Sequence, residues 1–251
     1  MELSLDGSVV LVTGGVRGVG LGITRAFLSA GAVVVTCARR PAEVPGASCV
    51  QCDVRDAEQV SSLVSGIVER FGRLDVVVNN AGGAPFALAD KASPRFHQKI
   101  VELNLLAPLL VSQAAYQVMK VSGGSIVNVS SVSGRRPSPG TAAYGAAKAG
   151  LDNLTASLAV EWAPRVRVNA LAVGMVRTEQ SHLHYGSEEG IAAVARTVPL
   201  GRLASPDEVG ACAVFLASPL ASYVSGSTLV VHGGGEMPAF LAAADTDGGS
   251  T

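Results

Sequence analysis

The chain is poor in charge, in aromatic residues and in cysteine. Charged residues make up 16% of its 251 positions, and 19 basic side chains nearly balance 20 acidic ones. Without a basic cluster the sequence lacks the electrostatic signature of a nucleic-acid-binding protein, so no nucleic-acid partner is expected. Hydrophobic residues reach 48%, which provides for a large buried core and excludes a chain that is disordered throughout.

Long hydrophobic runs are also missing. The longest apolar segment, residues 103–115, contains Asn104, Pro108 and Gln113 and is shorter than the roughly 20 residues that a membrane-spanning helix needs. Residues 1–15 show neither the basic start nor the cleavage site of a secretory signal. We therefore expect a cytoplasmic protein with no membrane contact.

The four cysteines are expected to be reduced thiols, because disulfides are rare in the cytoplasm. Cys49 and Cys52 have a C-x-x-C spacing, but no second pair and no nearby histidine accompanies them. In an extended strand their side chains point to opposite faces, so we interpret both as core or edge thiols. His182 and His184 lack a third ligand in view and are interpreted as loop or substrate-contacting residues. No metal site is predicted.

Short β-branched runs alternate with helical stretches along the chain. The expected strands are residues 9–12, 33–37, 49–54, 75–79, 125–130, 167–172 and 228–232, and the expected helices are residues 20–30, 57–71, 94–118, 142–162 and 206–217. This alternation predicts an α/β fold with one doubly wound sheet of about seven parallel strands flanked by helices. The crossover at residues 39–47 is short and contains two prolines, so it has room for one helical turn at most.

No linker divides the chain, so residues 1–234 are predicted to form a single domain. Residues 235–251 turn to Gly, Asp, Ser and Thr and are predicted to be a flexible tail. The alternative for residues 238–243 of this tail is that they contact a partner subunit.

A glycine-rich segment, residues 13–20, follows the first strand and opens a helix. Gly14 allows a sharp exit from the strand, Gly18 lets the backbone approach a pyrophosphate, and Gly20 permits close packing of helix on strand. The helix then offers free N–H groups and the positive end of its dipole to phosphates. This placement predicts a Rossmann-like dinucleotide site.

The end of the second strand indicates which dinucleotide binds. An NAD(H) site carries an acid there for the ribose 2′-hydroxyl, whereas this chain has Ala38 followed by Arg39. A small residue followed by arginine suits a 2′-phosphate, and Arg17 in the glycine loop is placed to reach the same group. NADP(H) is therefore favoured, and NAD(H) stays open as the alternative.

These residues begin a pattern that resembles the classical short-chain dehydrogenases/reductases from about Leu5 to Gly234. The other motifs that carry the resemblance are Asp53-Val54, Asn79-Asn80-Ala81-Gly82, Asn104, Asn128-Val129-Ser130-Ser131, Tyr144-Gly145-Ala146-Ala147-Lys148, and Asn169 with Gly174 and Thr178. Each motif is short, but their order and spacing together are specific to this family.

A proton-transfer site is expected at Tyr144 and Lys148, which share one helix face at i and i+4. A free phenol has a pKa of about 10, too high for good acid–base catalysis, and we expect the Lys148 ammonium to lower it. Ser131 would hold the substrate oxygen beside the phenol. By the resemblance, Asn104 orders a water that continues a proton relay from Lys148.

The resemblance also implies how the cofactor is held. Its phosphates and 2′-phosphate would lie on Gly14, Val16, Arg17, Gly18, Val19 and Arg39. Its adenosine would lie on Asp53, Val54, Asn80, Ala81 and Gly82, and its nicotinamide half on Tyr144, Lys148, Gly174, Val176 and Thr178. Residues 179–200 occupy the place of the family's substrate lid. Val173 stands where the family usually has proline, so the turn before Gly174 loses a fixed φ.

We therefore expect an enzyme that interconverts a small-molecule carbonyl and a secondary alcohol by hydride transfer, with Tyr144 as acid and base. Reduction of 3-oxoacyl thioesters on acyl-carrier protein is an alternative within this class. Alternatives from other classes are a non-catalytic nucleotide-binding regulator and a lyase or epimerase. The expected helix 142–162 is apolar on nearly all sides, which predicts a partner chain and so a homotetramer, with a dimer as the alternative.

Overall fold

Seven parallel strands form one sheet in the described part of the chain, which covers residues 3–40 and 42–243 of a computed structural model. The strands are β1 (Val9–Thr13), β2 (Val33–Ala38), β3 (Ser48–Gln51), β4 (Val76–Asn79), β5 (Gly124–Ser131), β6 (Val166–Val173) and β7 (Thr228–Val231). Their order across the sheet is β3-β2-β1-β4-β5-β6-β7, and every neighbouring pair is parallel. The doubly wound Rossmann-like fold is thus confirmed.

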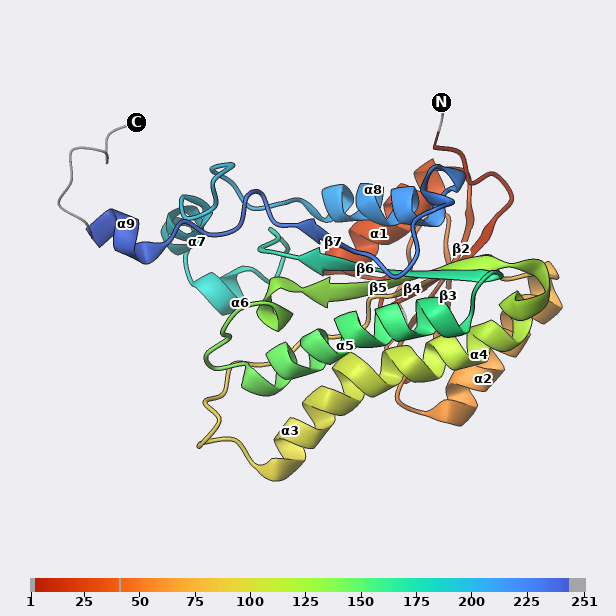
Figure 1. Cartoon of the computed structure of the whole chain (residues 1–251), viewed down its shortest axis with the longest axis horizontal. Helices are drawn as coiled ribbons and strands as arrows, with labels where there is room; N and C mark the ends of the chain where they lie inside the picture. The colour runs from red at the N-terminus through yellow and green to blue at the C-terminus, as the bar shows by residue number, and fades with distance from the viewer. Residues whose placement is uncertain (1–2, 41, 244–251) are drawn as a thin grey trace.

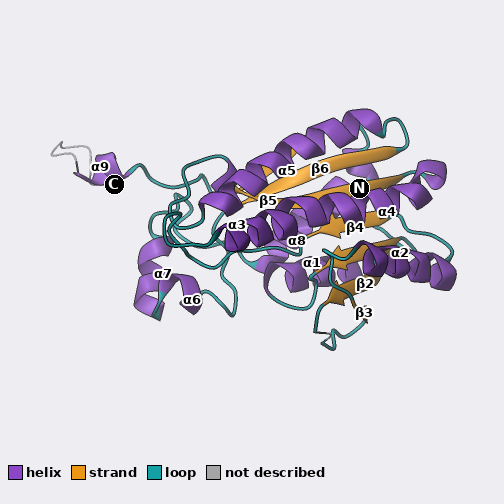
Figure 2. Cartoon of the chain, turned by 90° about the horizontal axis from the view of Figure 1, so that it is seen from below, coloured by secondary structure: helices purple, strands orange, loops and turns teal. Residues whose placement is uncertain are grey.

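Helices cover both faces of the sheet, as Figures 1 and 2 show. The strands are continuous apolar runs because both of their faces are buried. Residues of α1 (Gly18–Ser29) and α8 (Pro206–Ala217) pack on one face, and residues of α2 (Ala57–Phe71), α4 (Ala107–Ser122) and α5 (Ala142–Glu161) pack on the other. The bounds of α2 and α8 are the predicted ones.

Local sequence signals set where these helices begin and end. Asp56 caps α2 by accepting hydrogen bonds from the backbone N–H groups of the first turn, and Gly72 ends it with a φ of 74°. Ser205 and Glu208 form a reciprocal capping box at the start of α8. α1 and α8 cross closely at Gly22 and Gly210, where a Cβ atom on Gly210 would lie 2.7 Å from the Gly22 carbonyl oxygen.

The long helix predicted over residues 94–118 is interrupted. The structure has α3 (Pro94–Val101), a π-helical turn (Glu102–Leu106) and then α4. The backbone N–H of Ala107 donates to the carbonyl of Glu102, five residues back. Pro108 has no N–H to donate to Asn104 four residues back, so the regular ladder cannot continue at this point. The wide turn places the Asn104 side chain in the interior, at 0% exposure.

The third strand is shorter than predicted, ending at Gln51 rather than at residue 54. The described residues between β2 and β3 contain no helical turn, in line with the short crossover. Cys52 lies just past β3 and is buried, whereas Cys49 is half-buried on the other face of the strand. Cys52 raises the pKa of the buried Cys37 thiol on β2, so the two thiols are neighbours.

The segment after β7 contacts the lid. The predicted lid, residues 179–200, contains α6 (His182–Tyr185) and α7 (Glu188–Ala195). Met237 donates its backbone N–H to the Thr197 carbonyl, and Leu200 donates to the Gly233 carbonyl. The predicted tail therefore begins with residues bound to the lid and continues into α9 (Ala239–Ala243), which lies away from the sheet in Figure 1. Residues 244–251 lie outside the described part. Among the described helices none is both long and apolar enough to cross a membrane.

Candidate active site

The predicted site residues gather at the carboxyl edge of the sheet. Strand order reverses between β1 and β4, which is the place where open α/β sheets bind ligands. The glycine loop leaves β1 at this edge, and Asn80 follows β4. Ser131 ends β5 and is level with Val173 at the end of β6. Parallel strands thus bring these distant motifs together.

The glycine loop fits closely against the turn after β4. Gly14 has a φ of 65°, and a Cβ atom on it would lie 3.1 Å from the Ala81 Cα. A Cβ atom on Gly20 would collide with the Gly14 carbonyl oxygen and the Asn80 amide nitrogen. Gly18, at a φ of 52°, begins α1, and no side chain caps its first turn. The loop therefore presents backbone rather than side chains toward the sheet edge.

A threonine that sequence reasoning missed holds this loop to β4. Thr13 Oγ1 accepts the backbone N–H of Asn80 and of Ala81, at 3.0 Å each. The Asn80 amide donates back to the Thr13 carbonyl at 2.9 Å and to the Gly14 carbonyl at 3.2 Å. Asn80 thus ties β1 to β4, as predicted. The position of Thr13 directly before the glycines was the available signal.

Lys148 is buried where α5, β5 and the turn after β4 meet. It is 3% exposed, and its ammonium donates to the Val129 carbonyl of β5 at 2.8 Å. A Cβ atom on Gly82 would lie 2.7 Å from Asn104 Oδ1 and 3.5 Å from Lys148 Nζ. The glycine at this position therefore leaves room for the asparagine and the lysine to approach each other.

The Asn104 side chain is fully engaged with backbone. Its Oδ1 accepts from the Gly83 N–H, and its Nδ2 donates to the carbonyls of Gly83 and Ile100, each at 2.9 Å. These bonds fix the turn after β4 against the π-helical turn. Pro108 leaves the Asn104 carbonyl without its usual i+4 donor.

Tyr144 and Ser131 face each other across the start of α5. Ser131 Oγ accepts from the Ser133 N–H at 3.1 Å and lies near enough to the Tyr144 phenol to lower its pKa. Lys148 Nζ lies 5.6 Å from the centroid of the Tyr144 ring. The four predicted catalytic residues, Asn104, Ser131, Tyr144 and Lys148, thus converge on one place.

The expected lowering of the Tyr144 pKa by Lys148 is wrong for this structure. Burial raises the pKa of the Tyr144 phenol, and the neighbouring Ser131 hydroxyl lowers it by a smaller amount. The lysine does not reverse this shift, because its ammonium lies over the ring and binds the Val129 carbonyl rather than the phenol oxygen. Burial also lowers the pKa of Lys148, from 10.5 to about 8, although Asp152 opposes this.

The residues predicted for the nicotinamide half follow β6. Gly174 donates its N–H to the Val231 carbonyl, and a Cβ atom on it would lie 2.8 Å from the His232 Cβ. Val176 forms a parallel bridge with Ala204. The Thr178 methyl lies 3.7 Å from the position of a Cβ atom on Gly18. The start of the lid therefore faces the glycine loop.

Two of the arginines predicted for the 2′-phosphate are exposed and unpaired. Among the residues that the structure describes, neither Arg17 nor Arg39 has a carboxylate within 4 Å, whereas Asp53 is bound by Arg55 through two nitrogens. Hydrogen bonds from Arg55 are the largest cause of the lowered pKa of Asp53. The positive charge of Arg39 also lowers this pKa and is the smallest of the causes. Val16, Val19 and Val54 line the same edge as half-buried or buried apolar residues.

One ion pair binds the predicted lid to the segment before it: Arg177 pairs with Glu188 at 2.8 Å. A second pair, Arg136 with Glu236, joins the segment after β5 to the segment after β7. His182 and His184 lie on α6, and within the described residues no group of three or more metal-ligating side chains is present.

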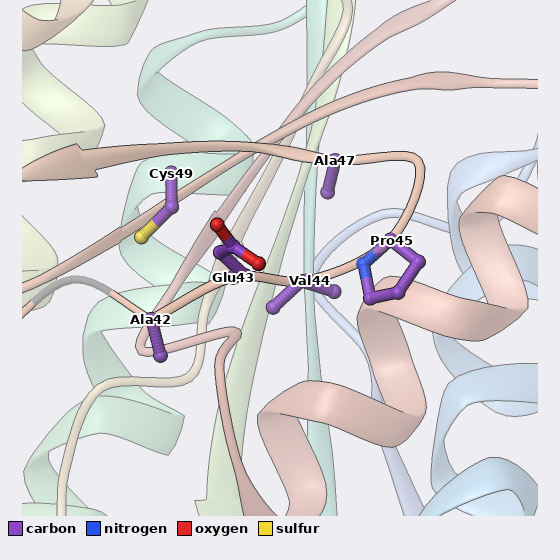
Figure 3. Close-up of a pocket in the computed structure, with 6 residues that line it drawn as sticks. All are labelled: Ala42, Glu43, Val44, Pro45, Ala47 and Cys49. Atoms are coloured by element: carbon purple, nitrogen blue, oxygen red, sulfur yellow. The ribbon is translucent and has the colours of Figure 1, made fainter.

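A separate surface pocket lies beside the β2–β3 connection and is shown in Figure 3. The β2–β3 connection and Cys49 line it, and it contains none of the predicted site residues.

Comparison with known proteins agrees with this geometry. Residues 14–236 match a protein-family model described as enoyl-(acyl carrier protein) reductase. The chain is 39% identical to L-fucose dehydrogenase of Oryctolagus cuniculus over 92% of this chain and 86% of that protein. It is 34% identical to galactitol 2-dehydrogenase of Agrobacterium fabrum, over 94% of this chain and 100% of that protein. The ligand-free structure of Thermoplasma acidophilum aldohexose dehydrogenase superposes with a TM-score of 0.89 at 29% identity, covering 99% and 98% of the two chains.

The chain therefore belongs to the short-chain dehydrogenase/reductase family. With that family it is an oxidoreductase that interconverts alcohols and carbonyl compounds by means of a nicotinamide dinucleotide. The predicted family, fold class and enzyme class are confirmed.

Proposed function

We propose that this enzyme is an NADP(H)-dependent dehydrogenase of sugars or polyols, in which Tyr144 exchanges the proton of the reacting oxygen. The observation that carries the proposal is a continuous set of contacts from the glycine loop to the catalytic lysine. Asn80 binds Gly14, and two residues further on Gly82 abuts both Asn104 and Lys148. A dinucleotide on the glycine loop would thus end beside the proton-transfer residues.

The residues present fit such a cofactor. Glycines stand where a Cβ atom would crowd the loop, and the uncapped first turn of α1 offers N–H groups to phosphates. Asp53 and Val54 would flank the adenine, Asn80, Ala81 and Gly82 its ribose, and Gly174, Val176 and Thr178 the nicotinamide half. When bound, the nicotinamide supplies or takes up the hydride.

The unpaired arginines support NADP(H) over NAD(H). Arg39 follows Ala38 at the end of β2, and Arg17 lies in the glycine loop. Both are exposed without a carboxylate partner in the described structure, so both are available to a 2′-phosphate.

The protein's own residues handle the proton. In the reductive direction Ser131 holds the substrate oxygen, and Tyr144 donates its proton to it. Burial raises the Tyr144 pKa, which keeps the phenol protonated at neutral pH, the form that acts as an acid. Lys148, 5.6 Å from the ring centroid, stabilises the phenolate that remains. In the oxidative direction the same groups accept the proton.

The substrate class is inferred from the relatives. The printed names of the three compared proteins are those of fucose, galactitol and aldohexose dehydrogenases. They favour a hydroxyl-rich substrate over a 3-oxoacyl or enoyl thioester. The segment before β5 carries Lys120 as its sole basic residue, which is a poor docking patch for an acidic carrier protein.

We further propose a homotetramer in the cytoplasm. One face of α5 is exposed and carries small apolar residues, and Val160 on this face is 80% exposed. A second copy of the chain would cover this face. The four free cysteines fit a reducing compartment.

The experiment is a panel of polyols, aldoses, simple secondary alcohols and acyl thioesters, assayed by cofactor absorbance with NADP(H) and NAD(H) in parallel. We expect turnover of a polyol or sugar with NADP⁺ preferred. Arg39→Asp should lower the NADP(H)-to-NAD(H) preference roughly 10- to 100-fold. Arg165→Asp, at the far end of the sheet, changes the net charge equally and should leave the preference alone. An unchanged preference in Arg39→Asp would refute the NADP(H) assignment, and turnover of thioesters alone would refute the substrate class.

A further inference from the structure

A carboxylate that the mechanism does not use lies one helical turn beyond the catalytic lysine. Asp152 follows Lys148 at i+4 on α5, so its side chain occupies the same buried helix face. Its side chain is 16% exposed. One oxygen, Oδ2, accepts from Arg135 at 3.1 Å, whereas Oδ1 is buried and has no hydrogen-bond partner in the described structure.

Burial makes the charged form of the neighbouring lysine unfavourable. Lys148 is buried, and among the described residues it forms no ion pair within 4 Å. A buried ammonium without compensation loses its proton readily, because burial disfavours the charged form. The neighbours of Lys148 are Tyr144 and Asp152 on α5, the Val129 carbonyl on β5 and Asn104 on the π-helical turn. Asp152 is the charged member of this set, and it is paired with Arg135.

Arg135 is brought to Asp152 by a close approach of backbones. The 3₁₀ turn Val132–Gly134, directly after Ser131, sits on α5. A Cβ atom on Gly134 would lie 2.6 Å from the Ala149 backbone nitrogen and 2.8 Å from the Lys148 carbonyl carbon. Only a glycine permits this contact. The next residue, Arg135, therefore lies beside α5, where its side chain binds the Asp152 carboxylate from the solvent side.

We propose that Asp152 is a positioning residue of the active site, whose carboxylate keeps the Lys148 ammonium charged. Arg135 weakens this effect, because it pairs with the same carboxylate from the surface. The proposal rests on the proposed role of Lys148. It extends the line of Tyr144 and Lys148 by a third residue, Asp152, with the three spaced four apart along α5. The direction of the Lys148 pKa agrees: burial lowers it and Asp152 raises it.

The test is the pH at which Lys148 loses its proton, measured in two ways. The first is the alkaline limb of the kcat/KM profile for the best polyol substrate. The second needs no activity: it is the pH at which the free energy of unfolding in urea begins to rise as Lys148 deprotonates in the folded protein. Asp152→Asn should move both to lower pH. Arg135→Gln, which leaves the carboxylate unscreened, should move both to higher pH. Asp152→Glu, which keeps the charge, should restore the kinetic limb toward that of the unmodified enzyme.

Opposite shifts in the two variants support the proposal. An Asp152→Asn variant that loses turnover equally at all pH values, with both transitions unmoved, would overturn it in favour of a structural role. A downward shift in Arg135→Gln would also overturn it. If the enzyme turns over none of the substrates tested, the unfolding measurement still decides the matter, so failure of the proposed function is distinguishable from failure of this inference.

Discussion

Replacing the catalytic lysine should make the protein more stable while abolishing its activity. The pKa of Lys148 falls from 10.5 to about 8 on folding, and a shift of that size corresponds to about 3 kcal/mol of lost stability. Lys148→Met removes this penalty but leaves the Val129 carbonyl without its donor, which costs about 1–2 kcal/mol. The variant should therefore be about 1–2 kcal/mol more stable at neutral pH.

The pH dependence separates the two contributions. Because the folded pKa is depressed, the penalty is complete below about 8, shrinks as the pH rises toward 10.5, and is absent above it. Urea unfolding of both proteins, at one fixed protein concentration, should show the advantage of Lys148→Met falling by about 3 kcal/mol across this window and changing sign. Lys120→Met, on the exposed end of α4, controls for the loss of one lysine. A difference between Lys148→Met and the unmodified protein that stays constant with pH would refute the reasoning.

Other substitutions test the packing around the cofactor. Gly20→Ala should weaken NADPH binding by at least about tenfold, or about 1.4 kcal/mol. The reason is that its Cβ atom would displace the Gly14 carbonyl and the Asn80 amide. A fluorescence titration with NADPH measures the change in affinity. Gly66→Ala, within α2 and with nothing inside 4 Å of the new Cβ atom, should leave binding unchanged and raise stability by about 0.5–1 kcal/mol in urea unfolding. Equal affinities in the two variants would contradict the first expectation, and a less stable Gly66→Ala would contradict the second. Thr13→Val should loosen the turn after β4 and cost about 1–3 kcal/mol, since two backbone N–H groups lose their acceptor, and unchanged stability would contradict this.

The sheet could be predicted from sequence because its strands are buried on both faces. Continuous Val-rich runs such as residues 76–79 leave few other interpretations, and the glycine loop marks which strand comes first. The placement of the predicted catalytic pair could also be predicted, since the i and i+4 spacing of Tyr144 and Lys148 puts both on one helix face.

What the sequence did not reveal depends on burial and on contacts between distant segments. The π-helical turn at Glu102–Leu106 adds one residue to a helical turn without a clear change in hydrophobic pattern. The pKa of Tyr144 is raised because desolvation outweighs its neighbours, and the extent of burial cannot be judged from spacing. The contact of Met237 with Thr197 joins two segments that are remote in sequence and lie in regions expected to be loops.

The proton-transfer role of Tyr144 is tested most directly by Tyr144→Phe, which removes the phenol oxygen and keeps the ring. We predict that kcat with the best polyol and NADP⁺ falls about 10²- to 10⁴-fold, while the NADPH dissociation constant measured by titration stays within the range of the unmodified enzyme. Turnover close to that of the unmodified enzyme would contradict the account.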